Sequence, residues 1–395
     1  MMLLEKVSGR LTREKHLLIL LFLMPFLLRL AFVFYVEVFM FPGTYLKLGD
    51  ESDYHYRTVA LVRGAGVNIS TDKLGYYAFL APIYFIFGPH RIVAIIIQCI
   101  LGAAACILIY QVVRTVFSTK VGMIAWLLCS LYPTLIWWCG FLVKESLLVF
   151  LLAMMLYTGM KAGRSGSGTG VILWTLCLFF AGFYTGLTRL TSFAFFPVMI
   201  LWIILSPKGV KGKIYCLLIV AVLSSLFLLS FKMPFAPFNR LEYSKITPAP
   251  LINRWVESFS NPSEQFAVEQ FGFSGFYRLW RPRPWSFLKR VPLVWRAFPD
   301  KTNRDLPAVA TGLLYLFLLP FAAYGFVCAL TWKPRDAIFL FLILFVFTAI
   351  HLFTLQRLRF RVQVMPVFLI FASTGLVDTW DYLIGLIRKR VRKGS

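Results

Sequence analysis

The chain has 395 residues, of which 59% are apolar and only 15% are charged. Soluble domains are about 45–50% apolar and about 25% charged, so this chain has too little polar surface to form a soluble globule. The formal net charge is +24. In a membrane protein this excess of Lys and Arg is typical of cytoplasmic loops and of contact with membrane lipids, and we expect no nucleic-acid partner. All seven cysteines lie in apolar runs, so no disulfide framework or cysteine-based zinc site is indicated.

Apolar runs long enough to cross a membrane follow one another along the chain. The first, Leu17–Phe41, is too long for a cleaved signal peptide and encloses Arg29. The short apolar segment Tyr76–Gly88 is expected to be a surface or re-entrant element. Together with the first run, nine others predict an all-α polytopic membrane protein of about ten transmembrane helices in a single domain, 1–395. These nine runs lie at about 91–113, 121–139, 142–160, 171–188, 190–206, 214–231, 307–331, 336–355 and 362–384.

The short loops between these runs indicate the orientation of the helices. With the N-terminus inside, every inner loop carries Lys or Arg, so both termini are expected on the cytoplasmic side of the inner (plasma) membrane. The C-terminal cluster Arg388–Lys393 is expected to lie on anionic lipid. Two long segments then face outside. They are 42–90, the first extracytoplasmic loop, and 232–305, which is rich in Pro, aromatic residues and Arg and is expected to contain short helices.

The first outer loop carries the most unusual local sequence, Gly49-Asp50-Glu51-Ser52-Asp53-Tyr54-His55-Tyr56-Arg57. On a helix, Asp50, Asp53, Tyr54 and Arg57 share one face, where one carboxylate can act as a base while Arg57 fixes another. The alternative is an ordinary helix N-terminus, at which the helix dipole favours acidic residues.

A second pair of charges, Lys144-Glu145, lies at the outer start of the fourth span within an almost wholly apolar stretch. A charge at such a place costs on the order of 2.5–3.5 kcal/mol on insertion scales, so these residues are expected to be paired or used. A simple Lys–Glu pair, or a lysine that reaches toward the head groups, is the alternative.

Arginines occur on the outer side at two further places, although the orientation rule predicts few basic residues there. Arg189 lies between the fifth and sixth spans, and Arg357-Leu358-Arg359-Phe360-Arg361 precedes the last span. The guanidinium of an arginine binds phosphate in a fork-like geometry, whereas contact with lipid head groups is the alternative role. We expect Asp50, Glu145 and Arg189 to lie close together around an outward-facing cavity that segment 232–305 roofs or flanks.

These features together resemble the GT-C superfamily of polytopic membrane glycosyltransferases. The resemblance is to the bacterial branch related to protein mannosyltransferases and aminoarabinose transferases, and it covers roughly residues 17–384. Each motif is short, and the argument rests on their order along the chain. The motifs are Gly49–Tyr54, Ala60–Gly64, Pro82–Gly88, Leu131–Pro133 with Lys144-Glu145, and Arg357–Pro366.

The resemblance implies transfer of a sugar from a polyprenyl-phosphate donor to an acceptor on the extracytoplasmic face, with inversion at the sugar. It implies an acidic base in the first outer loop, which maps to Asp50, with Glu51 and Asp53 as rivals. A second acidic position of the family maps to Glu145. The acceptor is a glycan, a lipid or a protein.

The residues support the same chemistry independently of the resemblance. Glycosyl transfer needs a base for the acceptor hydroxyl and positive charge for the departing phosphate. Asp50 fits the first role, and Arg189 or the cluster of Arg357, Arg359 and Arg361 fits the second, with Lys144 as a helper. Because arginine supplies the positive charge, we expect neither a cofactor nor a metal ion.

Two other functions stay open on the sequence alone. One is a transporter or flippase of lipid-linked glycans, although such a protein places polar residues near the bilayer midplane in broken helices. Here only Arg29 clearly lies within a predicted span. The other is a non-catalytic subunit of a polymer-assembly complex.

Overall fold

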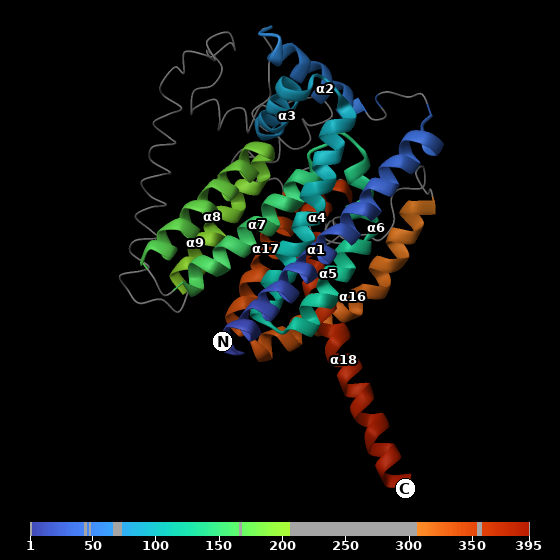
Figure 1. Cartoon of the computed structure of the whole chain (residues 1–395), viewed down its shortest axis with the longest axis vertical. Coiled ribbons are helices and arrows are strands. Elements are labelled where there is room, and N and C mark those ends of the chain that lie inside the picture. Colours follow the sequence, from blue (N-terminus) through green and yellow to red (C-terminus); the bar gives the residue numbers. More distant parts are fainter. Residues whose placement is uncertain are drawn as a thin grey trace, which may run out of the picture.

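The computed structural model describes residues 2–42, 46, 49–65, 73–165, 168–205, 306–353 and 358–394. Every regular element among these residues is helical, and the long helices pack into one bundle (Figure 1). The α-helices are α1 (Met2–Tyr35), α2 (Gly49–Val62), α3 (Leu74–Phe87), α4 (Arg91–Val116), α5 (Thr119–Leu131), α6 (Pro133–Trp137), α7 (Glu145–Arg164), α8 (Gly168–Thr188), α9 (Phe195–Leu205), α16 (Leu306–Trp332), α17 (Pro334–Phe353) and α18 (Met365–Gly394). The 3-10 and π segments are η1 (Val36–Met40), η3 (Trp138–Gly140), η4 (Leu190–Ala194) and η7 (Leu358–Val364).

Six of the described helices are long and apolar enough to cross a membrane, and the bent pair α5–α6 makes a seventh if it is one span. This result confirms the predicted all-α, multi-pass class. The six spans are His16–Met40, Arg91–Val116, Glu145–Arg164, Thr169–Thr188, Val309–Trp332 and Arg359–Arg388. Of the other predicted spans, 336–355 coincides with α17, 190–206 begins with η4 and α9, and 214–231 lies outside the described residues. The total of about ten therefore stays a prediction.

The predicted span 121–139 is bent rather than straight. α5 ends at Leu131 and α6 begins at Pro133, and the two helical parts meet at an angle of 55°. Proline disfavours helical backbone in the residue before it, and Tyr132 is extended, with φ −64° and ψ 116°. After η3 the chain stays non-helical from Phe141 to Lys144. A non-helical segment therefore lies directly before α7.

Pro25 removes one hydrogen bond from α1, and a neighbouring helix replaces it. Proline has no N–H to donate to the carbonyl of Leu21, and the Trp126 indole of α5 donates to that oxygen at 2.9 Å. One turn later, Arg29 is only 1% exposed. Its guanidinium donates to the carbonyls of Pro25 (3.0 Å) and of Cys129 in α5 (3.3 Å). The arginine predicted within the first span is therefore buried in the bundle and bonded to α5.

α16 and α18 approach backbone to backbone at two glycines. A Cβ atom added to Gly325 would lie 1.9 Å from the carbonyl oxygen of Phe371, and one added to Gly375 would lie 2.1 Å from that of Phe321. Small residues permit such close approach between membrane helices. This contact holds α18 in the bundle and thereby places η7, which directly precedes it.

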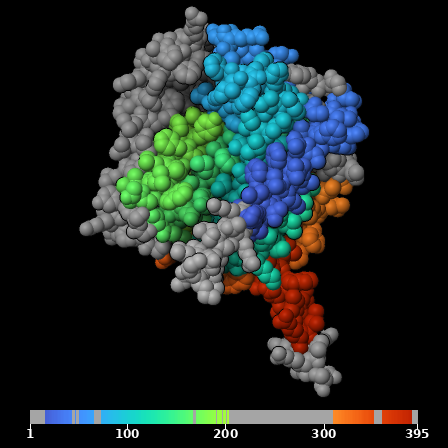
Figure 2. Space-filling model, in the orientation of Figure 1, coloured from blue at the N-terminus to red at the C-terminus, as the bar shows by residue number. Residues whose placement is uncertain are grey.

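The two chain termini lie at one end of the bundle, and α2 and α3 lie at the other (Figure 1). Near the termini, Arg164 of α7 pairs with Asp336 of α17 at 3.2 Å, and Lys120 of α5 pairs with Asp381 of α18. Beyond this contact α18 continues away from the other helices, as the space-filling view shows (Figure 2). Within the described residues, the segments predicted to be cytoplasmic therefore share one end of the molecule.

Candidate active site

α2 carries the acidic motif in its first turn, where the helix dipole stabilises negative charge. Its buried side chains recur at helical spacing and form one face: Glu51, Tyr54, His55 and Thr58. The side chains of Asp50 and Asp53 remain 35% and 24% exposed. The face expected to unite Asp50, Asp53, Tyr54 and Arg57 is therefore divided, because Tyr54 is buried and the two aspartates have different partners.

Asp50 forms an ion pair with Arg359 of η7, which follows it by 309 residues. The Nε of Arg359 also lies 3.8 Å from Oε1 of Glu145, the first residue of α7. Arg189, which follows α8, donates to the same Glu145 oxygen at 3.1 Å. We call these four residues the rim cluster. It joins α2, α7, the end of α8 and η7 at the end of the bundle opposite the termini.

Two members of the rim cluster are buried and two are partly exposed to solvent. Glu145 and Arg189 are 2% and 6% exposed, and a pair so buried is stable only with good geometry and further hydrogen bonds. Arg189 has such contacts, because its guanidinium lies 4.5 Å from the Phe360 ring and donates to the Phe360 carbonyl at 3.5 Å. The side chain of Arg359 is 23% exposed. Asp50 and Arg359 are therefore the members that solvent reaches most easily.

Arg361 and Lys144, two further predicted binding residues, lie beside the rim cluster in sequence, whereas Arg57 pairs with Asp53. Arg361 is 5% exposed, and its guanidinium lies 4.6 Å from the ring of Tyr315 in α16. Lys144 is 8% exposed and directly precedes α7. Arg357 and segment 232–305 lie outside the described residues, so their predicted roles stay predictions.

Asp53 has partners of its own on the outer face of α2. Its carboxylate pairs with Arg57 at 2.5 Å and with Lys73 at 2.9 Å, and it accepts a hydrogen bond from the Tyr77 hydroxyl at 2.9 Å. Burial acts to raise the pKa of Asp53, but the Lys73 ammonium and the Tyr77 hydroxyl outweigh it and hold that pKa below its usual value. Asp53 is therefore a weak base.

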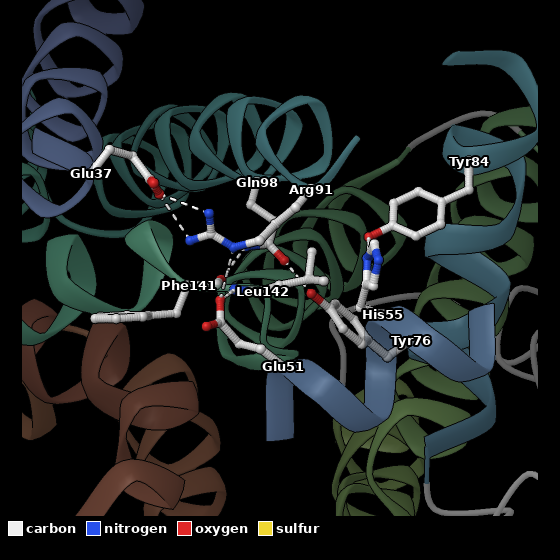
Figure 3. A network of polar contacts seen from close by, with 9 residues as sticks. All are labelled: Glu37, Glu51, His55, Tyr76, Tyr84, Arg91, Gln98, Phe141 and Leu142. Atoms are coloured by element: carbon white, nitrogen blue, oxygen red, sulfur yellow. Dashed lines mark hydrogen bonds and ion pairs between the residues drawn. The ribbon is translucent and has the colours of Figure 1, made fainter. Parts of the chain in front are cut away.

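Glu51 belongs to a second network, which is almost wholly buried (Figure 3). Its Oε1 accepts from the Leu142 backbone N–H at 2.6 Å and lies 3.4 Å from Nε of Arg91, the first residue of α4. Both terminal nitrogens of Arg91 donate to Oε1 of Glu37 at 2.8 Å. Glu37 and Arg91 are functional candidates that the sequence analysis missed. A charge is ordinary at the end of an apolar run, so only their position next to the acidic loop could have pointed to them.

Among the described residues, no three side chains of His, Cys, Asp or Glu are placed to hold a metal ion. What the rim cluster offers is a partly exposed carboxylate beside two guanidinium groups. This combination suits the binding of an anion next to a group that takes up a proton.

One family model matches part of the chain. Residues 74–231 match the family described as dolichyl-phosphate-mannose-protein mannosyltransferase. No curated protein is significantly similar to the chain in sequence.

Solved structures resemble the whole bundle. ArnT from Cupriavidus metallidurans, solved in the apo state, has a TM-score of 0.53 at 16% identity, over 91% of this chain and 61% of that one. The same protein bound to undecaprenyl phosphate has a TM-score of 0.53 at 15% identity, over 91% and 62%. The archaeal oligosaccharyltransferase AglB from Archaeoglobus fulgidus, in complex with an inhibitory peptide and a dolichol-phosphate, has a TM-score of 0.58 at 15% identity, over 97% and 52%.

The chain thus spans about three fifths of the length of ArnT and about half of that of AglB. At these identities the likeness is one of fold, and it agrees with the resemblance that the sequence motifs indicate. The chain is a multi-pass membrane protein with the fold of the GT-C superfamily.

Proposed function

We propose that the protein is a glycosyltransferase that moves a sugar from a polyprenyl-phosphate donor to a hydroxyl of a glycan, lipid or protein acceptor. The observation that carries this proposal is the rim cluster, in which Asp50 pairs with Arg359 beside Arg189 and Glu145. The GT-C fold supports the choice of reaction. ArnT binds undecaprenyl phosphate and AglB binds dolichol-phosphate, which supports a lipid-linked donor.

The donor phosphate is expected to bind at the two arginines. Arg359 presents a planar guanidinium that is only partly exposed, and Arg189 lies behind it against Glu145. A phosphate that binds Arg359 competes with Asp50 for the same hydrogen-bond donors. Binding of the sugar-lipid phosphate to Arg359 then frees the Asp50 carboxylate to act as the base.

In the proposed reaction the oxygen of the acceptor hydroxyl attacks the anomeric carbon of the sugar. The bond from that carbon to the phosphate oxygen breaks, and its electron pair stays on the phosphate, where Arg359 and Arg189 stabilise the charge. The Asp50 carboxylate takes the hydroxyl proton. A single displacement of this kind inverts the anomeric configuration.

Asp50 is the carboxylate of the acidic motif that suits this role best. Glu51 is fully buried and accepts hydrogen bonds from Leu142 and Arg91. Asp53 is held by Lys73 and Tyr77, which lower its pKa. The Asp50 side chain is 35% exposed, the largest value of the three, and it pairs with Arg359.

The reaction is assigned to the extracytoplasmic face of the inner (plasma) membrane. Lys120, Arg164 and the C-terminal basic cluster gather at the end of the bundle where both termini lie. Because basic residues favour the cytoplasmic side, the rim cluster at the other end then faces outward.

The test compares membranes from cells that lack the gene and carry the wild-type chain, Asp50→Asn or Asp381→Asn. Asp381 is a matched control, because it also pairs with a basic residue but lies at the opposite end of the bundle. Mass spectrometry of extracted lipids and glycans should show that Asp50→Asn accumulates a polyprenyl-phosphate sugar and loses its product, whereas Asp381→Asn restores it.

Normal product from Asp50→Asn at normal protein abundance would show that Asp50 is not the base. The alternative transport function predicts a different result. Purified protein in proteoliposomes would then move the labelled sugar lipid across the bilayer without transferring the sugar to any acceptor.

A further inference from the structure

One peptide bond next to the rim cluster is hydrogen-bonded through both of its polar groups by side chains. The carbonyl of Phe141 accepts from Nε2 of Gln98 in α4 at 2.8 Å. The N–H of Leu142 in the same peptide unit donates to Glu51 of α2 at 2.6 Å (Figure 3). Phe141 has extended dihedrals of −126° and 151°, so these groups make no helical hydrogen bonds. Besides the two side chains, the Val143 N–H donates to the Phe141 carbonyl at 2.9 Å.

The two side chains that bind this peptide are themselves fixed. The Tyr76 hydroxyl of α3 donates to Oε1 of Gln98 at 2.5 Å, which orients the amide so that its nitrogen faces Phe141. Arg91 lies beside Glu51 and is anchored by Glu37. Tyr76, Gln98 and Glu51 are all 0% exposed. A buried polar network in which these groups have partners specifies one arrangement of the chain.

The position of this network relates it to the proposed chemistry. Glu51 directly follows Asp50 in α2, and Leu142 precedes Glu145 by three residues. The hydrogen bond between Glu51 and Leu142 therefore joins the helix that carries one rim carboxylate to the segment that carries the other. Arg359 contacts both Asp50 and Glu145, so their separation decides how its guanidinium is held.

We propose that Glu51 and Gln98 are positioning residues that clamp the Phe141–Leu142 peptide and thereby hold Asp50 and Glu145 in register across Arg359. This inference rests on the proposed function. It assigns Glu51 a role other than that of a base, because its carboxylate is enclosed by the Leu142 N–H and Arg91 and is closed to solvent. A displacement of about 1 Å among reacting groups can lower a rate 10²-fold, so a clamp of this kind affects turnover strongly.

The clamp is tested first without reference to activity, by amide hydrogen exchange of the full chain in nanodiscs. Glu51→Gln and Gln98→Met should raise exchange in the peptide spanning residues 139–146 by about tenfold, because the first weakens the acceptor of the Leu142 N–H and the second removes the side chain that holds the same peptide unit at the Phe141 carbonyl. Asp50→Asn is the matched control in this measurement, since it alters the neighbouring carboxylate and leaves the clamp intact. Unchanged exchange in both clamp variants overturns the inference.

The second measurement is kinetic and uses as donor the sugar lipid that accumulates in cells lacking the gene. Glu51→Gln and Gln98→Met should lower kcat about ten- to hundredfold with little change in KM, while activity still rises with pH through the same pKa. Asp50→Asn should lose about 10²–10⁴-fold and lose that rise as well. If Glu51→Gln or Gln98→Met does not accumulate in the membrane, Tyr76→Phe replaces it in the same measurement, because it removes only the hydroxyl that orients Gln98.

The outcomes separate the clamp from the proposed function. If Glu51→Gln loses the pH-dependent rise, Glu51 is the base and the clamp is wrong. A normal kcat in both Glu51→Gln and Gln98→Met also contradicts the proposed clamp. If instead Asp50→Asn turns over normally, the proposed base fails, and the exchange measurement still decides whether the clamp exists.

Discussion

Arg91 is a buried cation between two carboxylates, those of Glu37 and Glu51. Its side chain is 4% exposed and that of Glu51 is 0% exposed. Removing one partner of a buried ion pair typically costs about 3–5 kcal/mol, because the charge left behind has lost its counter-ion. Arg91→Met should therefore lower the free energy of unfolding by about that amount.

Thermal unfolding in nanodiscs measures this effect, with Arg388→Met as the control. Arg388 is exposed on the projecting part of α18, so its replacement should change the melting temperature little. Equal melting temperatures for the two variants would mean that the network around Arg91 adds nothing to stability.

His55 should make the stability of the folded protein depend on pH. Burial lowers the pKa of His55 below its ordinary value of 6.5, and the nearby Arg91 lowers it further. The unfolded chain takes up a proton as the pH falls through 6.5, whereas the folded chain resists it, so stability is lost below that pH. Differential scanning calorimetry from about pH 7.5 to about pH 5.5 should show a larger fall in Tm for the wild type than for His55→Gln. Parallel curves would assign the loss to other groups.

The members of the rim cluster could be identified from the sequence, because each is a charge at an unusual place. Glu145 and Arg189 interrupt apolar stretches, and Asp50 opens an acidic motif. The pairings could not be predicted. That Glu51 points inward depends on how α2 packs against α3 and on the positions of Arg91 and the Leu142 peptide, and no pattern within the motif itself specifies this.

At the scale of elements, the contact between α16 and α18 depends on glycine at two places. Gly325→Ala would place a methyl group 1.9 Å from the Phe371 carbonyl, so the helices must separate. Overpacking of this kind costs about 1–3 kcal/mol. Gly385→Ala on α18 is the control, because nothing lies within 4 Å of its added Cβ, and it should be neutral or slightly stabilising. Thermal unfolding of both variants tests the contact, and similar Tm values would contradict it.

The bend between α5 and α6 shows why element boundaries were harder to predict than element types. The run 121–139 is apolar throughout, and hydropathy describes composition rather than backbone dihedrals. The relevant signal was Tyr132-Pro133, since proline restricts the residue before it. The non-helical segment Phe141–Lys144 carried no comparable signal, because its Phe141 carbonyl and Leu142 N–H are bound by Gln98 and Glu51, which are remote in sequence.

For the whole molecule, hydropathy and motif order were sufficient to predict the class and the superfamily fold. The number of spans and the prediction that segment 232–305 roofs or flanks the cavity both depend on 206–305, which lies outside the described residues.

The orientation of the molecule gives a further prediction. Both termini lie at the end opposite α2 and α3, so reporters fused to either terminus should signal from the cytoplasm. A reporter inserted in segment 232–305 should signal from the other side. Paired phosphatase and fluorescent-protein fusions measure this directly, and opposite signals from the two termini would contradict the arrangement.

Arg29 has a consequence for how the protein is made. Its guanidinium donates to the Cys106 thiol at 3.6 Å and to the Cys129 carbonyl at 3.3 Å, groups that are synthesised 77 and 100 residues after it. An arginine in the centre of a solitary helix opposes membrane insertion by about 2.5–3.5 kcal/mol. The contacts that satisfy this guanidinium therefore form only after α4 and α5 have been synthesised, so we expect α1 to reach its final packing after these two helices have joined it.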